Sequence, residues 1–167
     1  MSAQPIEEMF GSSSAASVVQ LEYITTSKTF KANRKGRLDI FVTGAHGSGA
    51  VAFNTGYASG PGAGECAYKT LDVEAGEEYV VTLGAGGASV SRNSVGVSSG
   101  NPGTDTTIVG PRVNMTVKGG GPGIGATALP VPGGLGGRGG TGGDEHHQGG
   151  DGGPITSATS MSVSGAG

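Results

Sequence analysis

The stretch GGLGGRGGTGGDEHHQGG, from Gly133 to Gly150, repeats two glycines in every three residues until a charged, histidine-bearing insert breaks the period. A polyproline-II-type helix has three residues per turn, so this repeat would place every third side chain on one edge and bare backbone on the other two. Such helices can pack side by side because no Cβ separates them. Residues 133–143 would form a rod of roughly 34 Å. We therefore expect ordered glycine packing here, in place of a flexible linker.

A single glycine rod cannot satisfy its own backbone groups, and ordering glycine costs more backbone entropy than ordering any other residue. Its partners must therefore be the other glycine-rich segments (44–64, 84–103 and 119–125) or other copies of the chain. A phosphate-binding loop is disfavoured, because LGAGGAS (83–89) follows a strand pattern but leads into no helix pattern. A collagen helix also fits poorly, because its repeat holds one glycine in three and abundant proline.

Short apolar runs between turn residues predict an all-β fold. They are VVQLEYI (18–24), LDIFVT (38–43), CAYKTLDV (66–73), EYVVTL (78–83), TTIV (106–109) and VNMTVK (113–118). We expect an antiparallel β-sandwich, jelly-roll-like, with glycine-rich loops, a polyglycine-II-type segment and almost no helix. The expected divisions are a docking segment with the first strand (1–26), the sandwich (27–118) and a glycine-rich tract with a return strand through Met161 and Val163 (119–167).

Composition argues against several classes of protein. Glycine supplies 36 of 167 residues, the formal net charge is −3, and Cys66 is the single cysteine. A multi-cysteine zinc site and an internal disulfide framework are thereby excluded, and the mild acidity argues against nucleic-acid binding. The first residues lack a signal-peptide pattern and no apolar run could span a bilayer, so we expect synthesis in the cytoplasm without membrane insertion. No catalytic arrangement is recognisable, so we expect neither an enzyme nor a cofactor.

Three sequence features are candidate binding elements. The insert gathers carboxylates and imidazoles, which can ligate metals. Because adjacent residues of an extended chain point to opposite faces, His146 and His147 are weak metal candidates, and a solvated loop tip is the favoured interpretation. Ile6, Met9 and Phe10 are a small apolar cluster suited to docking on a partner. The basic run at 28–37 holds half of the basic residues and spans a predicted turn, where solvated charge is expected.

The order of the strand and glycine motifs resembles a known domain. GRLDIFVTGAHGSG (36–49), LDVEAGEEYVVTLGAGG (71–87), GTDTTIV (103–109) and VNMTVKGGGPG (113–123) are similar to the glycine-rich domain of bacteriophage tail fibres and related virion proteins, over residues 27–153. The glycine tract also resembles the polyglycine-II bundles of T-even-like phage tip adhesins, although the sequence shows one clear rod where those have many. In these adhesins the loops between glycine helices contact the host receptor.

This resemblance implies a role and a set of contact residues. The chain would be a non-enzymatic virion protein, such as a small tail fibre, tail tip or capsid-attached fibre, that contributes to host attachment. Its partners would be other virion proteins, its own copies (a trimer favoured) and a host glycan or outer-membrane protein. A structural decoration or tail-assembly protein, and a metal- or ligand-binding module, remain alternatives. The candidate receptor-contact residues, in loops 126–132 and 144–148, are Leu129, Val131, Asp144, Glu145, His146, His147 and Gln148.

Overall fold

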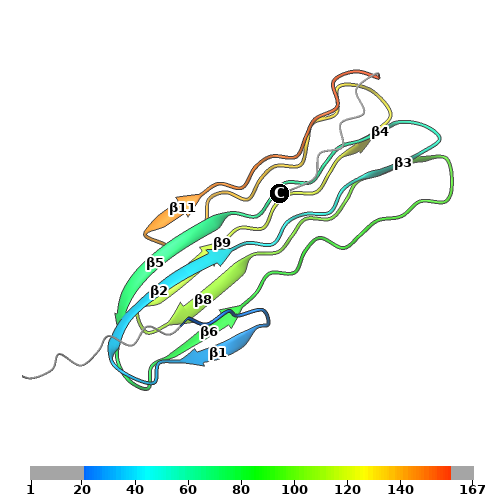
Figure 1. Cartoon of the computed structure of the whole chain (residues 1–167). Helices are drawn as coiled ribbons and strands as arrows, with labels where there is room; N and C mark the ends of the chain where they lie inside the picture. Colours follow the sequence, from blue (N-terminus) through cyan, green and yellow to red (C-terminus); the bar gives the residue numbers. More distant parts are fainter. Residues whose placement is uncertain (1–20, 159–167) are drawn as a thin grey trace, which may run out of the picture.

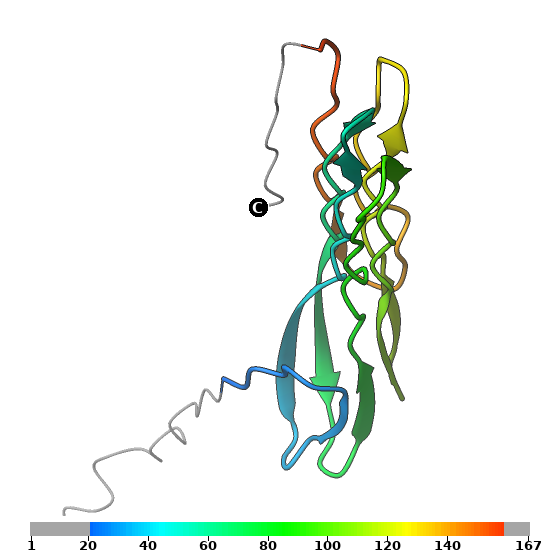
Figure 2. The ribbon, with the colours of Figure 1, turned by 90° about the vertical axis from the view of Figure 1, so that its right-hand side faces the viewer.

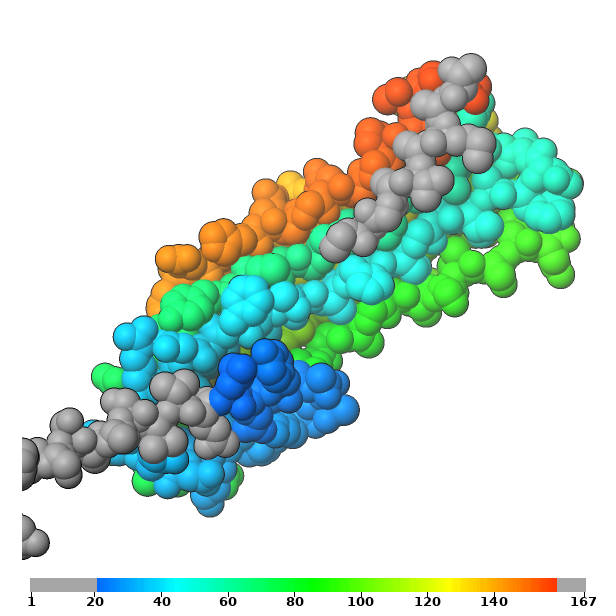
Figure 3. Space-filling model, viewed as in Figure 1, coloured from blue at the N-terminus to red at the C-terminus, as the bar shows by residue number. Residues whose placement is uncertain are grey.

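The computed structural model describes residues 21–158, an elongated body of antiparallel sheets with no helix in that range (Figures 1 and 3). This confirms the expected all-β, antiparallel class. The strands are β1 (Lys28–Lys31), β2 (Gly36–Thr43), β3 (Val51–Phe53), β4 (Tyr57–Ala58), β5 (Cys66–Val73), β6 (Glu78–Thr82), β7 (Gly96–Ser98), β8 (Thr106–Gly110), β9 (Val113–Val117), β10 (Gly125–Ala126) and β11 (Glu145–His147).

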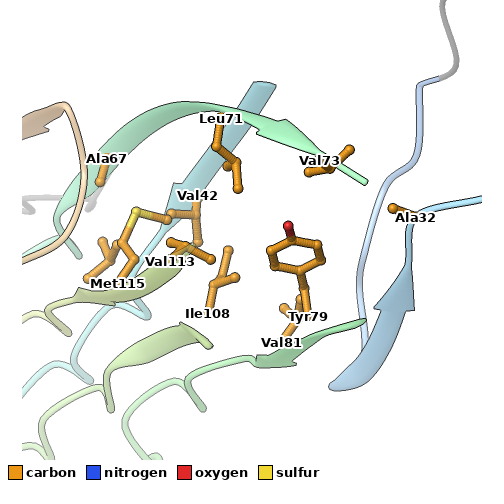
Figure 4. Packing of buried hydrophobic residues seen from close by; sticks show 11 residues of the cluster. Ala32, Val42, Ala67, Leu71, Val73, Tyr79, Val81, Ile108, Val113 and Met115 are labelled. Carbon is orange, nitrogen blue, oxygen red and sulfur yellow. The ribbon is translucent and has the colours of Figure 1, made fainter. Parts of the chain in front are cut away.

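Two sheets at one end of the body, the proximal end, enclose the apolar core, and we refer to this pair of sheets as the sandwich. One has the strand order β1-β6-β8-β9 and the other β11-β5-β2. Strand β6 shows why the layers form, because Tyr79 and Val81 are buried while the side chains between them are exposed. Side chains from β2 and β5, such as Val42 and Leu71, point toward Ile108 and the β6 residues across the core (Figure 4). Burial raises the pKa of Tyr79 to about 12, and its hydroxyl donates to Glu77 at 2.8 Å.

The remainder of the body is a bundle of extended glycine-rich segments that run along its length (Figure 2). Their backbone hydrogen bonds recur every third residue, as a three-residue turn requires. In one antiparallel pair the donors and acceptors are Gly44 to Glu65 (2.8 Å), Gly47 to Gly62 (3.1 Å) and Ala50 to Ser59 (3.3 Å). We call the seven segments the glycine bundle: 44–50, 59–65, 84–88, 99–105, 118–124, 133–138 and 149–153.

The rod expected at 133–143 is shorter in the structure, because Gly139 and Gly142 have positive φ. Its part 133–138 is one member of this bundle and is bonded to other glycine segments of the same chain. Gly134 and Gly137 donate to Gly60 (2.9 Å) and Ala63 (2.8 Å). Leu135 and Arg138, the third residues of the repeat, are exposed, while the glycines between them are buried. None of the glycines in the bundle has a positive φ, because the five positive-φ glycines of residues 21–158 all lie outside its segments.

The chain alternates between the sandwich and the bundle, so neither is continuous in sequence. Strands β2, β6 and β9 lead into bundle segments 44–50, 84–88 and 118–124, and each returns after a turn at the far end. We call that end the distal tip; there β3 pairs with β7 and β4 with β10. The boundary expected at residue 118 therefore falls inside a continuous strand and bundle segment. The docking residues Ile6, Met9 and Phe10 and the return strand lie outside the described residues.

We predict that a methyl group at Gly62 lowers the free energy of unfolding by about 1–3 kcal/mol. A Cβ there would lie closer than 3.0 Å to the backbone of Leu135 and Gly136 in the adjacent segment. Gly150→Ala is the matched control, because nothing lies within 4 Å of its added Cβ and its φ is not positive. Thermal unfolding followed by circular dichroism measures both. Equal melting temperatures for Gly62→Ala and the wild type would contradict close backbone packing.

Candidate functional site

The insert Asp144–Gln148 lies against the sandwich, where the sequence predicts a free loop tip. Glu145–His147 form β11, which pairs antiparallel with β5. The insert is therefore not a free loop tip, because β5 offers an open edge that local sequence does not reveal, although all of its residues except His146 are exposed as expected. The Asp144 carboxylate accepts hydrogen bonds from the Lys69 ammonium (2.7 Å) and the Thr70 N–H (2.8 Å), and these bonds lower the pKa of Asp144.

A buried carboxylate ties this strand to the glycine bundle. Glu65 is 2% exposed and stands where segment 59–65 passes into β5. Its carboxylate accepts from the backbone N–H of Lys118 (3.0 Å), the N–H of Gly140 (2.9 Å) and Nδ1 of His146 (3.0 Å). Buried charge is costly unless such donors surround it. Glu65 therefore joins β11 and three glycine-rich stretches at one point.

The geometry also fixes the roles of the two histidines. Nε2 of His146 accepts from the Gly143 N–H at 3.1 Å, so the ring proton resides on Nδ1 and faces Glu65. Both ring nitrogens of His146 are thus engaged within the fold. His147 is exposed, as alternation along a strand predicts, with Nε2 at 3.5 Å from the Glu145 carboxylate. Across residues 21–158 no three His, Cys, Asp or Glu side chains are grouped as metal ligands would be.

Three turns meet at the distal tip, far from the insert. They are the 53–57 turn between β3 and β4, the 90–96 loop before β7, and the 126–132 loop after β10. Phe53 is 39% exposed and Val95 is 62% exposed. The two predicted contact loops, 126–132 and 144–148, therefore lie at opposite ends of the bundle.

The arginine of the 90–96 loop orders that loop from within. The Arg92 guanidinium donates to the carbonyls of Ser94 (3.1 Å), Val95 (3.3 Å) and Val97 (2.9 Å) and to the Ser98 hydroxyl (3.0 Å). It is the single charged side chain of residues 79–104, and the sequence places none in 47–64, 119–137 or 152–158. The distal tip is consequently almost free of charge.

Two predicted contact residues in the 126–132 loop differ in accessibility. Val131 is 0% exposed, and its N–H and C=O bond with Ile155 at 2.9 and 2.8 Å in an isolated bridge. A buried side chain cannot contact a receptor, so the assignment of Val131 is wrong. Leu129 is half-buried and keeps an accessible part.

The basic run at the proximal end is largely paired with acids. Lys28 pairs with Glu22, and the other ion pairs are Lys31–Glu78 (3.3 Å), Lys35–Glu74 (2.9 Å) and Arg37–Asp39 (2.9 Å). These pairs neutralise the surface around the β1–β2 turn and leave little net positive potential for an anion. Exposed pairs of this kind contribute little to stability. Across residues 21–158, no helix has the length and apolar character needed to cross a bilayer.

Sequence reasoning missed Glu65 and Arg92 as organising residues. Glu65 is the single acidic residue between residues 40 and 71, and it is the last residue of the glycine-rich segment 59–65. Arg92 stands alone in a long uncharged stretch. An isolated charge inside an uncharged glycine-rich region is the pattern that could have indicated both.

The comparison with known families identifies the type of domain. A family model described as a glycine-rich domain matches residues 24–167. This range includes the strands of the sandwich and every segment of the glycine bundle. No curated protein matches the sequence.

We predict that Glu65→Gln lowers the free energy of unfolding by about 2–4 kcal/mol, because it turns an amide group toward buried donors and leaves some without an acceptor. Backbone amide exchange in β11 should accelerate as the strand loosens. The matched control is Glu145→Gln on the exposed side of β11, which should change stability by less than about 0.5 kcal/mol. Chemical denaturation and NMR hydrogen exchange measure these effects. An unchanged β11 in Glu65→Gln would show that the carboxylate does not hold it.

Proposed function

The chain belongs to the glycine-rich domain family, and from this premise we propose that it is a non-enzymatic virion protein that holds a contact surface away from its anchored end. In this proposal it is a small tail fibre, tail tip or capsid-attached fibre of a bacteriophage. In this proposal the anchored end is the sandwich, which holds β1, the first strand of the described chain, and the contact surface is the distal tip. The resemblance to phage fibre domains and tip adhesins supports the setting.

The convergence of three turns at one end of a hydrogen-bonded shaft is the observation that carries the proposal. These turns are separated by dozens of residues in sequence, yet the β3–β7 and β4–β10 pairs hold them together. Each turn connects two consecutive segments of the bundle that run in opposite directions. The three turns therefore lie at the same end of the bundle. Loops on a rigid scaffold are the usual location of binding residues. The fold therefore suits the display of a compound surface.

The composition of the tip suits contact with another macromolecule. The exposed groups are apolar side chains, such as Phe53 and Val95, together with small hydroxyl and amide side chains such as Thr55 and Asn93. Recognition loops of many binding proteins combine a few apolar anchors with adaptable polar groups in this way. The hydrogen bonds of Arg92 order the 90–96 loop before any partner binds, and this order reduces the conformational entropy lost on binding. A host-surface protein or glycan would bind here without strong long-range electrostatic attraction, because the tip carries almost no charge.

One observation favours the alternative of a decoration or assembly protein. Val80 and Val109 are directly paired across β6 and β8, and both are about half exposed on the outer face of the four-stranded sheet. Adjacent exposed apolar side chains often mark contacts with neighbouring subunits. A protein that used this face alone would assemble into particles without touching the host.

We predict that Phe53→Glu abolishes binding of the fluorescently labelled protein to susceptible bacterial cells, because it places a charge at the centre of an apolar tip. Phe41→Glu is the matched control: Phe41 is 71% exposed on β2 at the proximal end, and its replacement should leave cell binding intact. Flow cytometry over a panel of bacterial strains gives the readout. Absence of wild-type binding to every strain that the parent phage infects, with normal incorporation into particles, would support the decoration alternative instead.

A further inference from the structure

Three columns of chain lie side by side in one layer of the body. The central column is β9 with segment 118–124, and its neighbours are β8 with segment 99–105 and, on the other side, segment 133–138. Backbone hydrogen bonds connect both neighbours to the central column. Segments 44–50 and 59–65 bond to the inner side of this layer. Among the described residues no bundle segment bonds to its other side, which we call the outer layer face.

Every third residue of a column points out of the outer layer face, because three residues make one turn. In the central column, Gly120 and Gly123 donate to segment 44–50 on the inner side at 2.8 and 2.9 Å. The carbonyl of Gly121 accepts from segment 59–65, also on the inner side, at 3.0 Å. The residues between these positions therefore turn outward, and the same counting applies to the neighbouring columns. The outward residues are Pro102, Asp105, Gly119, Pro122, Leu135 and Arg138.

The outward row nearer the distal tip is apolar. The register of the backbone hydrogen bonds places Pro102, Pro122 and Leu135 at about the same height in the three columns. Leu135 is 62% exposed. The two prolines carry no N–H, so a partner that covers them leaves no donor unpaired. This row can therefore be buried against another protein surface at little cost.

The row nearer the sandwich carries opposite charges on opposite sides of the central column. Asp105 accepts from the Lys118 ammonium at 2.7 Å and from the Gly119 N–H at 3.0 Å. On the other side, Arg138 donates to the Asp151 carboxylate at 2.6 Å. The side chains of Asp105 and Arg138 are still 37% and 47% exposed, so each can take a further partner.

We propose that two copies of the chain pack together through their outer layer faces, related by a twofold axis that runs along segment 118–124. Half a turn about this axis places Asp105 of each copy against Arg138 of the other. The same rotation places Pro102 against Leu135 in the apolar row. A twofold contact requires a surface that is complementary to itself in this way.

The charges also fix the direction of the pairing. A twofold axis across the columns would place Asp105 against Asp105 and Arg138 against Arg138, and like charges would then repel. An axis along the columns avoids this repulsion, so both copies point the same way with their distal tips together. In the adjoining sheet this axis opposes Thr107 to Thr141, which flank Thr116 in one cross-strand row.

A shallow groove in the outer layer face fits this arrangement. The groove lies between segments 118–124 and 133–138, has a volume of about 280 Å³, and is lined by glycine backbone together with Lys118, Leu135 and Arg138. The twofold axis brings segment 99–105 of the second copy over this groove. Pro102 of that segment would fill the groove and cover Leu135, which is otherwise exposed to water.

The face is large enough for a specific but reversible pair. Residues 114–125 of the central column extend roughly 38 Å at about 3.2 Å per residue, and three columns about 4.8 Å apart cover roughly 14 Å. The product is roughly 500 Å² per copy, or about 1,000 Å² in total, which is near the lower limit for specific interfaces. We therefore expect a dissociation constant in the micromolar range. The pairing does not depend on what the distal tip binds.

Sedimentation equilibrium of the full chain, over about 1–200 µM, tests the pairing. We expect a monomer–dimer equilibrium, and we expect Leu135→Asp to raise the dissociation constant at least about tenfold, because a charge in the apolar row must lose its water. Val95→Asp is the matched control, since Val95 is also 62% exposed but lies at the distal tip. A monomer at every concentration, a trimer, or a dimer that Leu135→Asp does not weaken would overturn the proposal.

Charge reversal identifies the contact and its direction. Arg138→Glu sets acid against acid in a pair of identical copies, and Asp105→Lys sets base against base, so each variant alone should dimerise at least about tenfold more weakly. An equimolar mixture of the two variants should recover the wild-type dissociation constant, because every contact then joins an acid to a base. Circular dichroism checks that both variants are folded, and the Leu135→Asp comparison decides alone if Asp105→Lys is not. Two folded variants whose mixture stays monomeric would overturn the proposed contact.

Discussion

Hydrogen bonding between glycine backbones at close approach is the interaction on which the rest of this structure depends. Segment 118–124 is bonded to segments 44–50, 59–65, 99–105 and 133–138, so removing any one segment leaves unpaired groups on several others. Each bond contributes about 1 kcal/mol net, while ordering each glycine costs a similar or larger amount of entropy. The bundle is therefore stable only as a cooperative whole, joined to a sandwich that supplies conventional apolar burial.

The sandwich and the bundle are joined through continuous strands and through Glu65. The long strands β2 and β5 each pass into a bundle segment without a break, so the sandwich sets the spacing and direction of the segments. Where its own segment 59–65 passes into β5, Glu65 bonds two further glycine-rich stretches and β11. With its charges gathered near the sandwich and almost none at the distal tip, the molecule has two chemically different ends. This difference between the ends supports the proposal that one end anchors the protein and the other makes contact.

Sequence reasoning recovered the longer strands β2, β5, β6, β8 and β9 and the first part of the rod expected at 133–143, because period-two and period-three patterns are local. The strand expected at 18–24 was wrong over its described part, since residues 21–24 form no strand. Sequence reasoning recognised one rod where the structure has seven segments, because it looked for paired glycines. Only the row facing a neighbour must be glycine: segment 99–105 carries just Gly100 and Gly103, three residues apart, with Asn101 and Pro102 between them. The burial of Val131 and the pairing of β11 depend on distant partners, Ile155 and β5, which no local pattern indicates.

Residue-resolved hydrogen exchange within the bundle tests the central claim most directly. The amides of Gly62, Gly121 and Gly134 donate to backbone carbonyls of other segments and are not shielded by side chains of their own. The account predicts that they exchange as slowly as the amides of Val81 and Ile108 in the sandwich, through one shared unfolding event. Rapid exchange of the three glycines while the sandwich amides remain protected would contradict it, because the segments would then be flexible loops on a separate β-domain.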